Sequence, residues 1–277
     1  MELRIVARDR ELVCVSDKPV DKVIGYAVRF DDGSWANLRS RRYTGSAPGR
    51  VFFLRAPAEA NGPAGSSRRR DLGRVVELVL SGQGADVLIE PTDGQAVLDL
   101  HGPQSWVDSV TVDARAGHVR ATWGSDDDGV LRCLVPDRCR LGIEAGGDAH
   151  FWIAAPVAAL AVQLDDEASL VCEQASDLEL ELHDGARAFV ARARGRARVR
   201  AHGSGSAIIA GGHLAELDAA VVSTGSIVVH ATVDDALLSN TGSGALSAPA
   251  IGQLSERHAG AGPLLAGLPA QLDLEHW

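Results

Sequence analysis

The chain has 277 residues, of which 45% are hydrophobic and only 4% aromatic, and its formal net charge is -10. This composition excludes a disordered chain, and no apolar run approaches the ~20 residues that a membrane-spanning helix needs. The negative charge argues against general affinity for nucleic acid, whose phosphates demand a basic surface. Charged residues interrupt the opening stretch MELRIVARDRELVCV, so we recognise no secretory signal there and expect a cytoplasmic location.

Residues 1–56 are predicted to form a small N-terminal β unit. The stretch KVIGYAVRFDDGSWANL indicates two strands joined by a turn at Asp32 and Gly33, which is a β-hairpin signal, and RVFFLRA adds another strand. We expect this unit to cap one end of the repetitive region that follows, because an open solenoid end exposes unpaired strand edges. Residues 57–71 are rich in Pro, Gly and Ser, and we interpret them as a linker or mobile loop.

The main part of the chain, residues 72–248, is predicted to be a solenoid. Corners of small residues recur around Gly185, Gly205, Gly225 and Gly242, at intervals of 20, 20 and 17 residues. A period near 20 with short strands excludes helical repeats, whose periods are longer and whose apolar residues follow a 3.6-residue pattern. Each corner needs glycine for a positive φ or for close backbone approach. The predicted fold class is therefore all-β, a single-stranded parallel β-helix with about 20 residues per coil, preceded by a small β-hairpin cap.

Alternation along the strands predicts which side chains face inward. Successive coils place Leu180, Val199 and Ala219 in one inward column. A one-residue slip would turn every aliphatic side chain to solvent, so the register is strongly specified. Residues 74–123 contain less regular segments with the same pattern, such as RVVELVLSGQGADVLIE, and we expect them to form further coils.

The outward residues of the same strands carry opposite charges. Stacking coil on coil places Glu179 beside Arg198, Arg198 beside Asp218, and Glu181 beside Arg200. Parallel strands lie about 4.8 Å apart, so these side chains can pair along the stack. Each exposed pair contributes about 0–1 kcal/mol, and the larger effect is to penalise a wrong register.

Two histidines form the sharpest pair of candidate ligands. His183 and His202 are 19 residues apart, which is the local coil length, so they should lie directly above one another at a corner. Stacked histidines could bind a metal or titrate together near neutral pH. The next coil places Val222 in this column and no third ligand is evident, so we predict neither a metal site nor a cofactor.

The C-terminal segment, residues 249–277, is rich in Pro and Gly with scattered Leu, and we expect it to cap the other end of the stack or to contact a neighbouring subunit. Four cysteines are present, and the spacing of Cys133 and Cys139 is not that of a common zinc pair. We interpret all four as reduced thiols packed as small hydrophobic residues.

The segments SGQGADVLIE and GSGSAIIAGGHLAELDAAVVSTGSIVVHATVDDALLSNTGSGALS resemble a family of bacterial β-solenoid proteins described as "putative auto-transporter adhesin" or "head GIN domain" proteins. In that family a Gly-Ser-Gly corner followed by alternating aliphatic residues recurs about every twenty residues. The resemblance covers residues 72–248. It implies a parallel β-helix, offers no catalytic residues to transfer, and is accompanied in many members by export.

Two classes of function remain. The first is a non-catalytic binding or assembly scaffold, whose partner is another protein or a second copy of the chain. The second is a carbohydrate-active enzyme of the lyase, hydrolase or epimerase type, acting on a glycan at an exposed face. The stack from 157 to 240 contains one aromatic residue, Phe189, and this favours the first class because sugar sites usually stack rings on aromatics. The candidate exposed patch comprises Glu179, Glu181, Arg198, Arg200, Asp218, His183 and His202.

Overall fold

The computed structural model describes the chain as two compact units, the first formed by residues up to Ala64 and the second beginning at Gly65. In the first unit it describes the backbone of the strands alone. In the second it describes residues 66–124, 129–248 and 250–266. No helix in these ranges is both long enough and apolar enough to cross a bilayer.

The N-terminal unit contains two antiparallel sheets. One has the strand order β1-β2-β7 and the other the order β3-β4-β5-β6. The strands are β1 (Glu2–Ala7), β2 (Arg10–Ser16), β3 (Val20–Ile24), β4 (Ala27–Phe30), β5 (Trp35–Asn37), β6 (Arg42–Thr44) and β7 (Val51–Ala56). β4 and β5 pair on either side of the expected turn at Asp32 and Gly33, with Arg29 opposite Trp35. The role of this unit as a cap stays a prediction.

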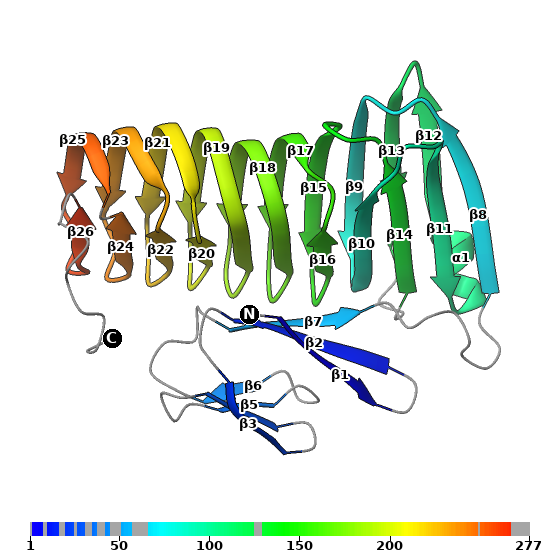
Figure 1. Cartoon of the computed structure of the whole chain (residues 1–277), viewed down its shortest axis with the longest axis horizontal. Helices are drawn as coiled ribbons and strands as arrows, with labels where there is room; N and C mark the ends of the chain where they lie inside the picture. Colours follow the sequence, from blue (N-terminus) through cyan, green and yellow to red (C-terminus); the bar gives the residue numbers. More distant parts are fainter. Residues whose placement is uncertain are drawn as a thin grey trace. The chain divides into compact units, whose positions relative to one another are not determined.

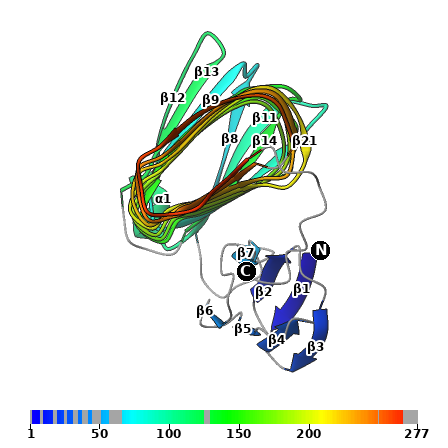
Figure 2. The ribbon, with the colours of Figure 1, turned by 90° about the vertical axis from the view of Figure 1, so that its left-hand side faces the viewer.

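The second unit is a parallel β-solenoid of about 7 turns with about 19 residues per turn, which confirms the predicted fold class. Seen along the solenoid axis, the turns superimpose as a flattened ring with two long sides (Figure 2). We call these sides the first wall and the second wall. The first wall comprises β9 (Glu77–Gln83), β15 (Arg140–Gly146), β17 (Val157–Leu164), the C-terminal halves of β18 (Ser169–Leu182) and β19 (Arg187–Ala201), β21 (Gly212–Val221), β23 (Thr232–Asn240) and β25 (Ile251–His258). The second wall comprises β10 (Ala85–Pro91), β16 (His150–Ile153), the N-terminal halves of β18 and β19, β20 (Ser206–Ile209), β22 (Ser226–Val229), β24 (Ala245–Ala248) and β26 (Leu264–Ala266).

The inward columns of the first wall have the predicted register. Leu180 in β18 pairs with Val199 in β19, and Val199 pairs with Ala219 in β21. These three side chains are at most 1% exposed. Because the alternation has a period of two, the same register turns the intervening charged residues outward. The interior is filled by a continuous cluster of buried, mostly aliphatic residues that runs from turn to turn.

The first coils depart from the expected simple order. β9 pairs in parallel with both β13 (His118–Thr122) and β15, and β10 pairs in parallel with both β14 (Gly129–Val135) and β16. The β9–β10 coil therefore lies between the β13–β14 coil and the β15–β16 coil, although it precedes both in sequence. β12 (Thr111–Arg115) and β13 form an antiparallel hairpin, so residues 74–123 are not a run of consecutive coils.

The stack ends here in antiparallel strands, as the right-hand side of Figure 1 shows. β11 (Ala96–Gly102) runs antiparallel to β14 and to β8 (Ser66–Gly73), and the short helix α1 (Gln104–Ser109) follows β11. Residues 66–71, the end of the predicted linker, instead lie in β8. Arg68 pairs with Asp108 of α1 at 2.7 Å. A charged terminal strand discourages the addition of a further strand from another chain.

The corner glycines are required by close backbone approach. Gly205, Gly225 and Gly244 follow one another along the stack, because Ser206 pairs with Ser226 and Ser226 with Ala245. A Cβ atom on Gly225 would overlap the carbonyl oxygen of Gly205, and one on Gly244 would overlap that of Gly225. None of these three glycines has a positive φ.

Two corners occupy slightly different positions from those expected. Arg187 pairs with Ser206, so the residue that matches Gly205 is Ala186 and not Gly185. In the later corner the matching residue is Gly244 and not Gly242. The sequence alignment of the corners was wrong by one and by two residues there, because each corner contains more than one small residue.

The stack continues past residue 248. β25 pairs in parallel with β23, and β26 pairs in parallel with β24. Residues 251–266, which we expected to belong to a cap or tail, therefore form a further turn of the solenoid. The expected contribution of the last eleven residues, 267–277, lies outside the described residues.

Three cysteines lie inside the solenoid as free thiols. Burial raises the pKa of Cys139 to about 11 and that of Cys172 to about 12, and it raises the pKa of Cys133 well above its usual range. The thiols therefore stay protonated at neutral pH, which agrees with their interpretation as small hydrophobic residues. The side chain of Cys14 lies outside the described part of the chain.

Candidate functional site

The predicted charge column lies on the outward side of the first wall. Arg198 is the register partner of both Glu179 and Asp218. Its guanidinium lies 3.5 Å from a carboxylate oxygen of each. Arg200 approaches Asp218 more closely, with 2.5 Å between Nη2 and Oδ2. The structure thus brings together the charges that the sequence placed side by side.

Glu181 differs from its expected pairing. It is the register partner of Arg200, but its carboxylate lies near the two histidines. Arg200 instead turns to Asp218, because Asp218 offers it both a carboxylate oxygen and a backbone carbonyl. The seven candidate residues therefore form two clusters. We call Glu179, Arg198, Arg200 and Asp218 the charge ladder, and Glu181, His183 and His202 the histidine corner.

The charge ladder should influence the register more than the stability. The side chains of Arg198 and Glu179 are 61% and 59% exposed, so each pair contributes about 0–1 kcal/mol. We expect Arg198→Glu to lower the free energy of unfolding by about 1 kcal/mol more than Arg198→Ala, since it places three carboxylates side by side. Urea denaturation of the two variants measures this difference.

Salt and a second arginine serve as controls for this prediction. In 1 M NaCl the difference between the two Arg198 variants should shrink, because the Debye length falls to about 3 Å. Arg194 lies on the same strand and forms no ion pair with the described residues, so Arg194→Glu and Arg194→Ala should be nearly equal. A salt-independent difference at Arg198 would rule out electrostatics as its cause.

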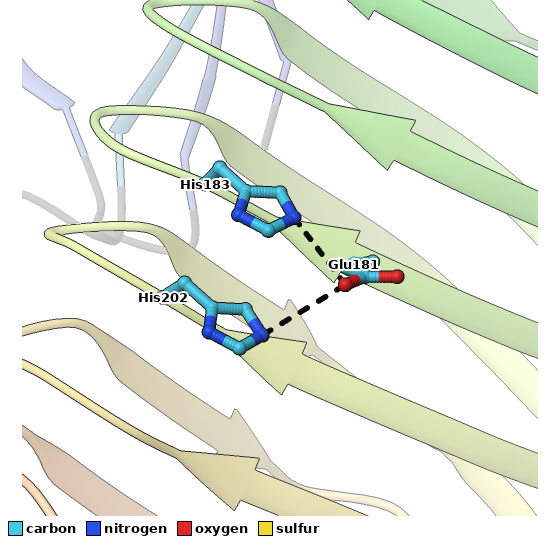
Figure 3. Close-up of side chains that lie close together, drawn as sticks. All are labelled: Glu181, His183 and His202. Carbon is cyan, nitrogen blue, oxygen red and sulfur yellow. Dashed lines mark ion pairs between the residues drawn. The ribbon is translucent and has the colours of Figure 1, made fainter.

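The histidine corner is formed by His183 and His202, one turn apart (Figure 3). Their ring centroids are 4.7 Å apart and their planes differ by 7°, which confirms the predicted stacking. Glu181 Oε1 lies 3.3 Å from Nε2 of His183 and 3.9 Å from Nε2 of His202. Glu181 is thus a third ligand candidate, which the sequence reasoning missed. The available signal was its position two residues before His183, near the end of the strand that His183 follows.

A groove of about 820 Å³ runs along the outward side of the first wall. Gly142, Ala159 and Ala161 are short residues that leave room in its lining. Its charged residues are six carboxylates and three arginines: Glu77, Asp177, Glu179, Glu216, Asp218, Asp235, Arg140, Arg196 and Arg198. None of the described residues that line it is aromatic.

Sequence reasoning identified only one of the two charged columns in this groove. Asp177, Arg196 and Glu216 form a second column, each two residues before a member of the first. The period-two alternation could have revealed them, since residues i and i+2 of a strand share one face. The depth of the groove could not have been predicted, because it depends on short side chains from separate strands meeting in space.

No protein-family model matches this sequence, and no curated protein matches it either. Solved structures do resemble it. A "putative adhesin" from Parabacteroides merdae is 14% identical over 74% of this chain and 96% of its own, with a TM-score of 0.56.

Two further structures give a similar result. A "putative adhesin" from Parabacteroides distasonis has 17% identity, a TM-score of 0.52, and coverage of 75% of this chain and 98% of its own. One from Bacteroides fragilis has 13% identity, a TM-score of 0.51, and coverage of 74% and 98%. This chain therefore shares its β-solenoid fold with bacterial proteins described as adhesins, as the resemblance of its repeats implied.

Proposed function

We propose that this protein is a non-catalytic binding scaffold that holds a partner against the outward side of the first wall. The groove over the charge ladder is the observation that carries this proposal. It is open, it extends over many turns, and it is lined by side chains that a partner can pair with.

The packing of the solenoid supports an external site. The interior is filled by the buried cluster, so a ligand has to contact the outside. One outward column of the second wall is apolar and little exposed: Trp152, Val171 and Ile208 are 9%, 4% and 5% exposed. The exposed, ion-paired side chains of Glu179 and Arg198, by contrast, lie on the first wall.

The charge of the groove favours a partner with cationic groups. Six carboxylates and three arginines give its lining an excess of negative charge. Complementary charge speeds association and selects among partners more than it raises affinity. The alternating signs along the ladder suit an extended segment that carries both Lys or Arg and small residues. The fold neighbours are described as "putative adhesin" proteins, and this description fits a binding role without turnover.

Defined peptides test this proposal on the full chain. We expect an extended Lys/Arg-rich peptide to bind more tightly than a Glu-rich peptide of the same length, and its affinity to fall from 50 to 200 mM salt. Ala161→Trp should weaken binding of the Lys/Arg-rich peptide, because it fills the groove without changing any charge. Ala114→Trp, on the exposed strand β12, is the matched control. Equal binding by the two variants would contradict the proposal, as would equal affinity for both peptides.

The alternative functions give different results. Light scattering at micromolar concentration should report a dimer or trimer if the scaffold assembles with itself, and a monomer would remove self-assembly from the proposal. Turnover of an acidic polysaccharide that is abolished by Glu181→Gln or His202→Ala would establish the carbohydrate-active enzyme instead.

A further inference from the structure

The corner that carries His183 and His202 brings three metal-binding groups together. One ring nitrogen of His183, one of His202 and a carboxylate oxygen of Glu181 all lie within 4.8 Å of one another. The groups come from adjacent turns, as Figure 3 shows, with both rings beside the same carboxylate. They lie at the edge of the first wall, outside the residues that line the groove.

The backbone ladder fixes the spacing of the two imidazoles. The amide of His183 donates to the carbonyl of Leu164, and the amide of His202 donates to that of Leu182. Each histidine is thus the first residue after a paired strand, held one turn from the next. Val222 follows in this column, and the ligand atoms that lie within 4.8 Å of one another belong to two rings and one carboxylate.

Two imidazoles and one carboxylate are a ligand set that zinc uses, with a fourth position left for water or substrate. Zn–N and Zn–O bonds of about 2.0–2.2 Å place neighbouring ligand atoms of a tetrahedral site about 3.3 Å apart. The distance from Glu181 Oε1 to His183 Nε2 is already 3.3 Å, and that to His202 Nε2 is 3.9 Å. The carboxylate is therefore close to the spacing that one ion imposes, and the two ring nitrogens lie within 4.8 Å of one another.

Binding requires one rearrangement of the rings. A nitrogen lone pair lies in the plane of its ring, so two rings inclined by only 7° do not yet aim at one point. The side chains of His183 and His202 are 30% and 33% exposed, so the surrounding packing leaves them room to tilt. Arg200, the nearest cation by register, is held by Asp218 and does not occupy the carboxylate of Glu181.

We infer that Glu181, His183 and His202 bind a zinc ion that joins two adjacent turns of the solenoid. Without the ion, the carboxylate of Glu181 contacts both rings. With the ion bound, the carboxylate and the two rings each form one bond to the same cation. This site is independent of the proposed peptide groove, and either proposal can fail without the other.

Zinc titration of the metal-free full chain tests the site. After dialysis against a chelator, isothermal titration with zinc chloride should report one ion per chain, and the melting temperature should rise with zinc concentration. Cobalt(II) in place of zinc should give the strong visible absorption of a tetrahedral site. Circular dichroism of the metal-free variants checks that each one folds.

Substitutions show whether these three residues are the ligands. Removing a metal ligand should lower the zinc affinity at least as much as removing a residue that hydrogen-bonds to a ligand. We therefore expect His202→Ala, His183→Ala and Glu181→Gln each to weaken zinc binding by at least about 100-fold. His213 is the matched control, because it also lies beside a carboxylate, 3.1 Å from Asp234, but no second histidine of the described residues stacks on it. His213→Ala should bind zinc as the unmodified chain does. The inference is wrong if the unmodified chain binds no stoichiometric zinc, if His202→Ala binds it equally well, or if His213→Ala loses it equally.

Discussion

Replacing Gly225 by alanine is expected to destabilise the solenoid by about 3 kcal/mol, at the upper end of the cost of overpacking. The added Cβ would overlap the carbonyl oxygen of Gly205 in the preceding turn. A backbone atom cannot rotate away as a side chain can, so the two corners have to move apart. Because each turn contacts only its neighbours, the effect should appear as a lower urea midpoint for the whole stack.

Two other glycines allow the loss of stability to be compared at positions with different room for a Cβ atom. A Cβ on Gly205 would lie 2.9 Å from the carbonyl oxygen of Leu182, and one on Gly211 would lie 3.7 Å from that of Ala191. Neither glycine has a positive φ. The loss of stability should therefore rank Gly225→Ala above Gly205→Ala, and Gly211→Ala should be close to neutral. An equal loss at Gly211 and Gly225 would exclude close approach as the reason for glycine at these corners.

Replacing Asn240 by leucine is expected to lower the free energy of unfolding by about 3 kcal/mol, although the residues that precede it in its column, Leu182, Ala201 and Val221, are apolar. Asn240 is fully buried. Its Nδ2 donates to the carbonyls of Gly244 and Pro263, at 2.8 and 3.2 Å, and its Oδ1 accepts from the amide of Gly242 at 3.1 Å. Each buried backbone group left without a partner costs about 1–3 kcal/mol. The carbonyl of Pro263 still accepts from the amide of Leu246, so the carbonyl of Gly244 and the amide of Gly242 are the groups that lose their partner. The gain from an apolar side chain does not offset these two losses.

Conservative variants separate the effect of the Asn240 hydrogen bonds on stability from the effect of its side-chain volume. Asn240→Asp keeps the acceptor but loses both donors, and should be destabilised as well. Ser239→Ala, one residue earlier on the outward side, should change the urea midpoint little. If Asn240→Leu is as stable as the unmodified chain, the corner does not depend on this side chain.

The sequence predicted the repetitive part of the fold because its signals are local. Alternation at a period of two assigns Leu180, Val199 and Ala219 to one face, whichever strand lies beside them. The spacing of the corners then fixes the turn length, and together these gave the register of the charge ladder. The histidine stack followed in the same way, since 19 residues is one turn.

The order of the first coils could not be predicted in this way. Ala85 pairs with Gly129, and Asp86 pairs with His150, so one strand has two neighbours that are distant in the chain. The alternating aliphatic pattern of β10 fits either neighbour equally well. Only the packing of the complete end of the stack, with β8 and β11 antiparallel beyond it, places this strand between the two.

The candidate sites also have features that local sequence patterns predict and features that only tertiary packing decides. By itself the sequence determined the fold class, the buried face and the columns in which Glu179, Arg198, His183 and His202 lie, because period and alternation are properties of neighbouring residues. Only the tertiary structure decided that Glu181 turns toward the histidines and that short side chains from separate strands leave a groove. Those features depend on side-chain direction and on contacts between turns, which no local pattern specifies.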